Sequence, residues 1–138
     1  MRGWILLSLH PTNSEMTYRK VNYRDVEQVS SAMHFLREPL NTEQVGVTVA
    51  RCNPGWKSQP HDHADNEREE VYVLIDGGAS VVVDGEDIEM EEGDAIWIAP
   101  ESTRQIRNGD EESAFFLVSG PCIARGEDNE WFVSGFPG

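Results

Sequence analysis

The chain has 138 residues, 38% of them hydrophobic, and its 25 acidic and 11 basic side chains give a net charge of −14. This length fits one domain with a real core, and the composition fits neither a disordered chain nor a membrane span. Nucleic acid and anionic lipid would be repelled by so negative a surface, so we expect neither as a partner.

The basic residues are mostly arginines: the chain has nine arginines and two lysines, Lys20 and Lys57. Many carboxylates with few lysines are typical of proteins kept soluble in high salt, so we weigh a halophilic source against an ordinary acidic cytosolic protein. Cys52 and Cys122 lack CxxC spacing. They indicate free thiols in a reducing cytoplasm.

Residues 1–15 are treated as an N-terminal extension to a domain that covers 16–138. The apolar run in this extension, 4–9, is too short for a usual signal core or a membrane span. Two origins stay open for the extension: an upstream start codon before Met16, or an arm that packs on a partner subunit. Next along the chain, 25–36 is expected to form a helical turn, and 34–40 to be extended.

From residue 44 onward, short β-type runs alternate with turn residues, and no sustained helical period appears. Asp84-Gly85 is a strong hairpin signal between two of these runs. The sequence therefore predicts an all-β antiparallel sandwich or barrel. Its expected strands cover 44–51, 70–76, 79–85, 86–90, 95–99, 104–110 and 113–120. In the tail that follows, the aromatic side chains either cover a barrel mouth or dimer seam, or belong to a frayed end; they are Trp131, Phe132 and Phe136.

A candidate metal-binding set lies at 60–76. His61 and His63 share one face if their stretch is extended, and Glu70 shares a face with Tyr72 on the next strand. Two imidazoles and one carboxylate can hold a divalent cation at roughly 2.0–2.2 Å per bond. Such a set with open positions is known for Fe(II), and similar ligands hold Zn or Mn.

Two stretches resemble the paired motifs of the cupins. GWKSQPHDHADNEREEVYVLIDG (55–77) is similar to the first motif, and GDAIWIAPESTRQIRN (93–108) to the second. The resemblance covers about residues 47–118. It implies a single-domain jelly-roll barrel of the double-stranded β-helix type, with a metal or ligand pocket inside. It also implies a homodimer, in which 16–24 would supply an N-terminal pairing strand.

The chain departs from the cupin pattern at two positions. The spacer before Glu70 is longer than usual, so Glu67 competes with it; we favour Glu70 because its distance to Gly77 fits the motif. The histidine of the second motif is replaced by Arg104, which cannot donate a lone pair to a cation. If Arg104 points inward, either three protein ligands hold the metal or Arg104 grips an anion; the alternative is a rim arginine paired with Glu101 or Asp110.

Three functions remain open. The first is a cupin that binds one divalent ion (Fe, Mn, Zn or Ni) through His61, His63 and Glu70 and acts on a small anionic organic molecule, with dioxygenase or isomerase chemistry. The second is a non-catalytic binder or sensor with Arg104 as anion anchor. The third is a metal-free structural barrel. The expected substrate-binding residues are Arg104, Tyr72 and Gln59.

Overall fold

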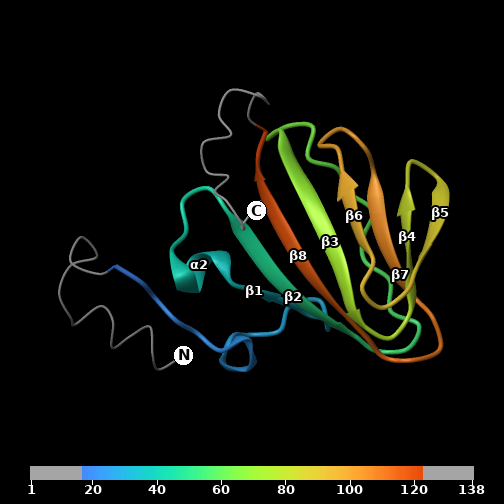
Figure 1. Cartoon of the computed structure of the whole chain (residues 1–138), viewed down its shortest axis with the longest axis horizontal. Helices are drawn as coiled ribbons and strands as arrows, with labels where there is room; N and C mark the ends of the chain where they lie inside the picture. Colours follow the sequence, from blue (N-terminus) through green and yellow to red (C-terminus); the bar gives the residue numbers. More distant parts are fainter. Residues whose placement is uncertain (1–16, 123–138) are drawn as a thin grey trace, which may run out of the picture.

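The computed structural model describes residues 17–122, which are mainly β-structure (Figure 1). The first elements along the chain are η2 (Tyr23–Asp25), β1 (Met33–Phe35), α2 (Arg37–Leu40) and β2 (Gly46–Cys52). They are followed by β3 (Arg68–Asp76), β4 (Ala79–Val83), β5 (Glu86–Met90), β6 (Ala95–Ile98), β7 (Arg104–Asn108) and β8 (Ser113–Pro121). Within these residues, no helix is long and apolar enough to cross a bilayer.

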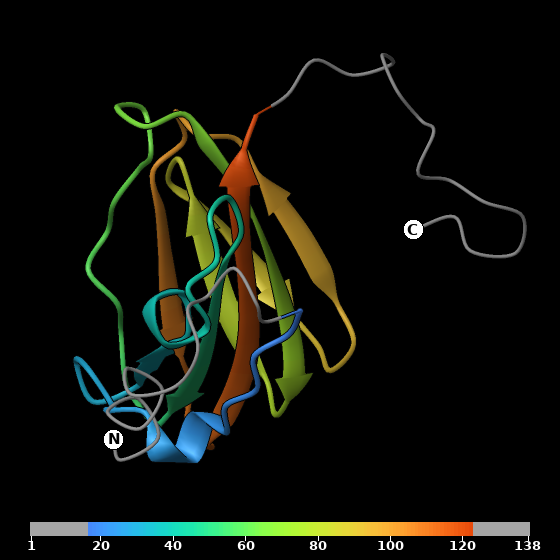
Figure 2. The same cartoon turned by 90° about the vertical axis from the view of Figure 1, so that its left-hand side faces the viewer.

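The strands form two sheets, ordered β1-β2-β8-β3-β6 and β5-β4-β7, and all of their pairings are antiparallel. Figure 2 shows the two sheets as layers, one behind the other. This architecture of two facing antiparallel sheets confirms the predicted all-β fold. The expected hairpin also forms, because Asp84 and Gly85 both adopt positive φ between β4 and β5 (49° and 86°), as a tight two-residue turn requires.

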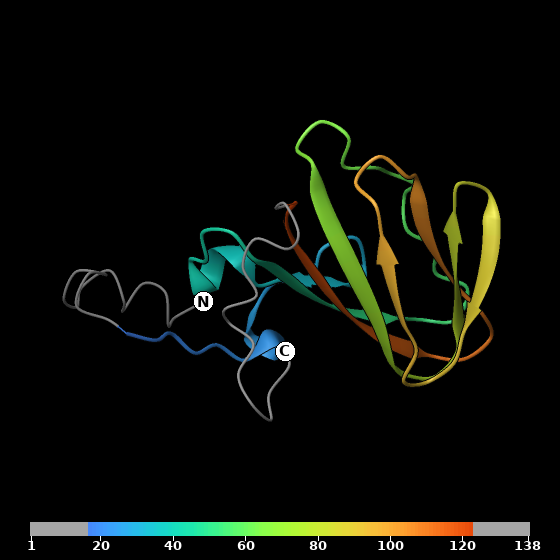
Figure 3. The same cartoon turned by 45° about the horizontal axis from the view of Figure 1, so that its top comes forward.

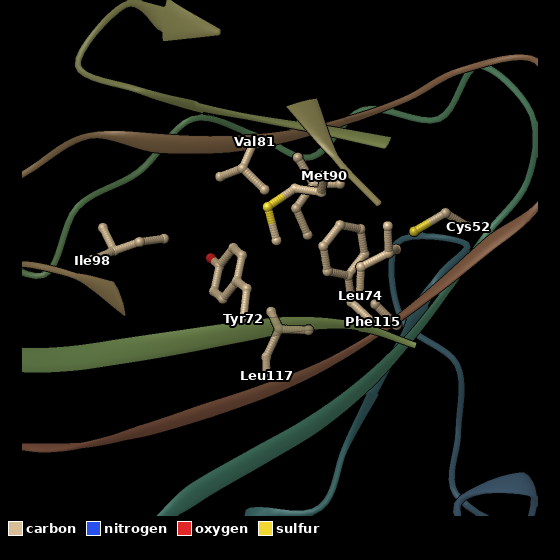
Figure 4. Packing of buried hydrophobic residues seen from close by; sticks show 10 residues of the cluster. Cys52, Tyr72, Leu74, Val81, Met90, Ile98, Phe115 and Leu117 are labelled. Atoms are coloured by element: carbon tan, nitrogen blue, oxygen red, sulfur yellow. The ribbon is translucent and has the colours of Figure 1, made fainter. Parts of the chain in front are cut away.

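The core lies between the two sheets (Figure 4). Strand alternation turns Tyr72 and Leu74 of β3 inward, where they meet side chains from the smaller sheet such as Val81. Burying each apolar side chain of this kind contributes about 1.5–3 kcal/mol. The core cluster consists of Ala50, Cys52, Tyr72, Leu74, Val81, Met90, Ile98, Ile106, Phe115 and Leu117.

Two expectations for the region before β2 are wrong. The segment 25–36 was expected to be helical, but helix is confined to Tyr23–Asp25, and β1 forms because it gains an edge pairing with β2. The segment 34–40 was expected to be extended, but its second half is α2. Pro39 is compatible with this single turn because its missing N–H lies where a helix leaves donors unpaired.

A buried polar network closes the end of the molecule where β7 meets β2. The Asn108 side-chain amide donates to the carbonyl oxygens of Cys52, Asn53 and Glu111 at 2.7–3.2 Å. Its own oxygen accepts a 2.8 Å hydrogen bond from the Ser113 hydroxyl. Asn108 therefore ties the end of β2 to the turn between β7 and β8, which follows Asn108 directly in the chain.

Candidate metal centre

The two histidines lie on a segment that runs along β7 as an irregular edge strand. Figure 3 shows this green segment between β2 and β3 passing beside β7. Ser58 N donates to the Ile106 carbonyl at 3.0 Å, and His61 and Arg104 exchange both backbone hydrogen bonds, at 3.0 and 2.8 Å. Residues directly opposite in an antiparallel pair share a face, so His61 lies on the same face as the inward-pointing Arg104.

His63 and Glu70 flank the turn that links this segment to β3. His63 N donates to the Pro100 carbonyl at 2.7 Å, and the turn is closed by Glu67 N donating to the His63 carbonyl, also at 2.7 Å. Glu67 itself is exposed, with a positive φ of 53°. Glu70 instead enters β3 on its inner face and is only 9% exposed. The longer spacer is therefore taken up by the turn, and Glu70 is the carboxylate that joins the histidines.

The three side chains converge. One ligand atom each from His61, His63 and Glu70 lies within 4.8 Å of the others, and the imidazole centroids of the two histidines are 5.1 Å apart. His63 Nε2 lies 3.3 Å from Glu70 Oε2. Ligands that share one ion at about 2.1 Å are separated by roughly 3.0–3.4 Å, so this pair already has suitable spacing.

His63 Nε2 is a buried nitrogen without a hydrogen bond from any group in residues 17–122, because its contact with Glu70 Oε2 lacks hydrogen-bond geometry. A buried polar atom without a partner is rare in a folded protein and calls for an explanation such as an ion. The donor set is also suitable, since two imidazoles and a carboxylate are ligands for Fe, Mn, Zn and similar ions. The residues present therefore fit a divalent metal.

The backbone of Gln59 orients His61. Its carbonyl lies 3.3 Å from His61 Nδ1, so a proton on Nδ1 leaves Nε2 free as a ligand atom. The Gln59 side chain itself is exposed. What the structure offers from Gln59 is thus a carbonyl behind a histidine, and a substrate contact by its amide remains a prediction.

Arg104 points into the barrel and is fully buried. Its Nη1 donates to Glu70 Oε1 at 2.7 Å, and its Nη2 donates to the Ala99 carbonyl at 2.6 Å. The alternative of a rim arginine paired with Glu101 or Asp110 is therefore wrong. Two of its three nitrogens are already engaged, and only Nε is without a partner among residues 17–122.

Tyr72 supports the same carboxylate oxygen. Its hydroxyl donates to Glu70 Oε1 at 3.1 Å, and its ring packs edge-on against Phe115. Burial, reinforced by the nearby Glu70 charge, raises the pKa of Tyr72 far above its ordinary value. Tyr72 therefore stays protonated and acts as a hydrogen-bond donor to Glu70.

The arrangement divides the Glu70 carboxylate between two tasks. Oε1 accepts from Arg104 and Tyr72, while Oε2 faces His63. The carboxylate thus lies between the guanidinium and the histidines, which reduces the repulsion that Arg104 would exert on a cation.

Backbone acceptors in the β6–β7 turn were not predicted from the sequence. The Ala99 carbonyl holds Arg104, and the Pro100 carbonyl holds His63 N. Pro100, which ends the β6 run, indicates a turn in the sequence. The directions in which the carbonyl groups of that turn point depend on the folded backbone, so the sequence does not predict them. Trp97 is 55% exposed and donates from Nε1 to Glu69 at 2.8 Å on the outer face of the sheet.

Known proteins similar to this chain include an enzyme from Mycobacterium tuberculosis. That protein, Beta-D-galactosidase Rv1717, is 32% identical over 83 residues, which are 60% of this chain and 69% of the relative.

Solved structures show the same fold. A cupin protein from Bacteroides fragilis is 26% identical, with a TM-score of 0.66 over 82% of this chain and 89% of that one. A sugar phosphate isomerase of the cupin superfamily from Silicibacter pomeroyi is 20% identical, with a TM-score of 0.59 over 75% and 76% of the two chains. The family model of the cupin domain matches residues 48–120, just over half of the sequence, and the chain belongs to this family.

Proposed function

We propose that this protein is a metal-dependent cupin that binds one divalent ion through His61, His63 and Glu70 and acts on a small, oxygen-rich organic molecule of the sugar or sugar-acid type. The observation that carries the proposal is the convergence of the three ligand atoms within 4.8 Å around the unpartnered His63 Nε2. A bound divalent ion would supply a Lewis acid that polarises a carbonyl or hydroxyl oxygen of such a molecule.

The surrounding residues would prepare the ligand set. The Gln59 carbonyl favours the His61 tautomer with a free Nε2, and the His63 backbone is held by Pro100. Arg104 and Tyr72 hold Glu70 Oε1, so the carboxylate presents Oε2 in one fixed orientation. Preorganised ligands of this kind cost little entropy when an ion binds.

The substrate class rests on the relatives. One relative is named a β-D-galactosidase, and a structural neighbour is named a sugar phosphate isomerase. Polyhydroxylated molecules offer neighbouring oxygens that can complete the coordination of an ion with open positions.

A second candidate is a binding protein without turnover. This candidate is favoured because the polar side chains inside the barrel already have partners. Tyr72 is kept protonated by its raised pKa, and Arg104 donates hydrogen bonds to Glu70 and to the Ala99 carbonyl. Neither is free to move a proton on a substrate. In this version, the ion and its open positions serve recognition alone.

Elemental analysis of protein purified without added metal tests the ion. We expect one divalent ion per chain in the wild type and none in His61→Ala, with the fold of the variant intact by circular dichroism. The matched control is Glu67→Gln, which removes an exposed carboxylate of the same loop and should keep the ion. Metal retained in His61→Ala, or lost in Glu67→Gln, would refute this ligand set.

Incubating the metal-loaded protein with sugars and sugar acids then separates the two candidates. Product formation by nuclear magnetic resonance that is lost in His61→Ala supports the enzyme. Saturable binding without product supports the binder.

A further inference from the structure

The metal centre has an unusual charge balance because its buried carboxylate is paired with a buried guanidinium. Glu70 contributes one negative charge and Arg104 one positive charge, and both lie in the interior. With neutral imidazoles, these protein groups sum to zero, so a bound divalent ion would keep both of its positive charges. A neutral residue in place of Arg104 would leave a single net positive charge.

From this balance we infer that Arg104 is a positioning and specificity-determining residue that makes the metal-loaded site selective for dianionic ligands. The inference rests on the proposed function. It changes the role expected for Arg104, because the guanidinium acts through Glu70 and through its charge, and contact with the ligand is not required.

The contacts of Arg104 explain why its charge is effective there. The side chain has no exposed surface, and Nη1 and Nη2 are fixed by Glu70 and Ala99 at 2.7 and 2.6 Å. Charges inside a protein interact much more strongly than charges at its surface, where water and salt screen them. The unpartnered Nε of this buried side chain is a further donor that protein groups in residues 17–122 do not satisfy.

The loop beside the site carries opposing charges, but they are placed differently. Asp62, Asp65 and Glu67 are all exposed. Their effect on an anion is therefore screened and falls with added salt. The buried Arg104 charge is much less screened, so the preference for a dianion should persist at physiological ionic strength.

The test compares two small carboxylates on the Mn²⁺-loaded full chain at constant ionic strength. Malonate is the dianion probe and acetate the monoanion probe, both followed by isothermal titration calorimetry. The electron paramagnetic resonance signal of free Mn²⁺ reports any stripping of the ion. We expect malonate to bind roughly tenfold more tightly than acetate.

Two substitutions separate charge from shape. Arg104→Gln removes the charge but keeps an amide that can donate to Glu70, and we expect it to lose most of the malonate preference. Arg104→Lys keeps the charge but loses the guanidinium fork, and we expect it to retain the preference. Arg107→Gln, which removes the exposed arginine of the same strand, should behave as wild type.

The outcomes distinguish a failure of the proposed function from a failure of this inference. If the wild type binds no Mn²⁺, the proposed function is wrong and this inference with it. If Mn²⁺ binds but malonate and acetate bind equally, or if Arg104→Gln keeps the preference, the inference alone is overturned. Equal binding of the two anions by the wild type overturns the inference even where Arg104→Gln fails to fold, and Arg104→Lys then remains as the second variant at this position.

Discussion

Two buried polar clusters of this protein differ in how completely their groups are paired. At one end, the Asn108 amide makes three donor bonds and accepts one, so the network is closed. At the other end, Glu70 contacts Arg104, Tyr72 and His63. Even so, His63 Nε2 and Arg104 Nε make no hydrogen bond to any group within residues 17–122. A fully paired network stabilises a fold, whereas an unpaired buried group calls for an explanation such as an ion.

The largest expected effect tests the open cluster directly. In His63→Ala, we expect the affinity for Mn²⁺ or Zn²⁺ to fall at least about 100-fold, because the nitrogen nearest to Glu70 Oε2 is removed. Circular dichroism of the metal-free variant checks that the fold is kept. A variant that binds metal as the wild type does would show that the open cluster is not a metal centre.

The closed cluster should respond in the opposite way. Asn108→Ala leaves three carbonyl groups and the Ser113 hydroxyl without their partner, so we expect a loss of about 2–4 kcal/mol in the free energy of unfolding. Urea unfolding measures this loss, and metal stoichiometry at low temperature should be unchanged. Loss of metal in a folded Asn108→Ala protein would break the division between the two clusters.

Restoring the histidine of the cupin pattern sharpens the comparison further. We expect Arg104→His to raise metal affinity about tenfold or more, because it removes a buried positive charge and adds a ligand atom. Isothermal titration calorimetry measures the change, with Arg107→Gln as the surface control. Unchanged or weaker affinity would place position 104 outside the reach of the ion.

The smallest effect concerns the tyrosine that supports Glu70. The folded-state pKa of Tyr72 is raised above its ordinary value of 10.0, so above about pH 10 the unfolded chain releases a proton that the folded protein keeps. Stability should therefore be fully present below pH 10 and should fall above it by up to about 1.4 kcal/mol per pH unit. Tyr72→Phe should show a shallower fall in urea unfolding between pH 9.5 and 11; an identical slope would argue against a buried, protonated Tyr72.

The clusters also differ in how far they could be predicted. Asn108 lies within the expected strand 104–110, and its bonds with Glu111 and Ser113 are local, but its bonds to the carbonyls of Cys52 and Asn53 join segments more than fifty residues apart and had no signal in the sequence. In the open cluster, the spacing predicted that His61 and His63 share one face, the cupin motif favoured Glu70 over Glu67 on the next strand, and the structure brings the three side chains together. The direction of Arg104 was left open, because strand parity alone cannot distinguish an inward side chain from one at a rim.

The sequence by itself determined the β-strands after residue 44, the hairpin at Asp84-Gly85 and the shared face of His61 and His63, because alternation and turn chemistry are local properties of the chain. Only the tertiary structure decided that β1 is an edge strand, that Glu67 is excluded from the site, and that Arg104 is buried between Glu70 and Ala99. These outcomes depend on pairings and carbonyl directions between segments far apart in the sequence. Such contacts are set by packing the whole chain and have no local signal.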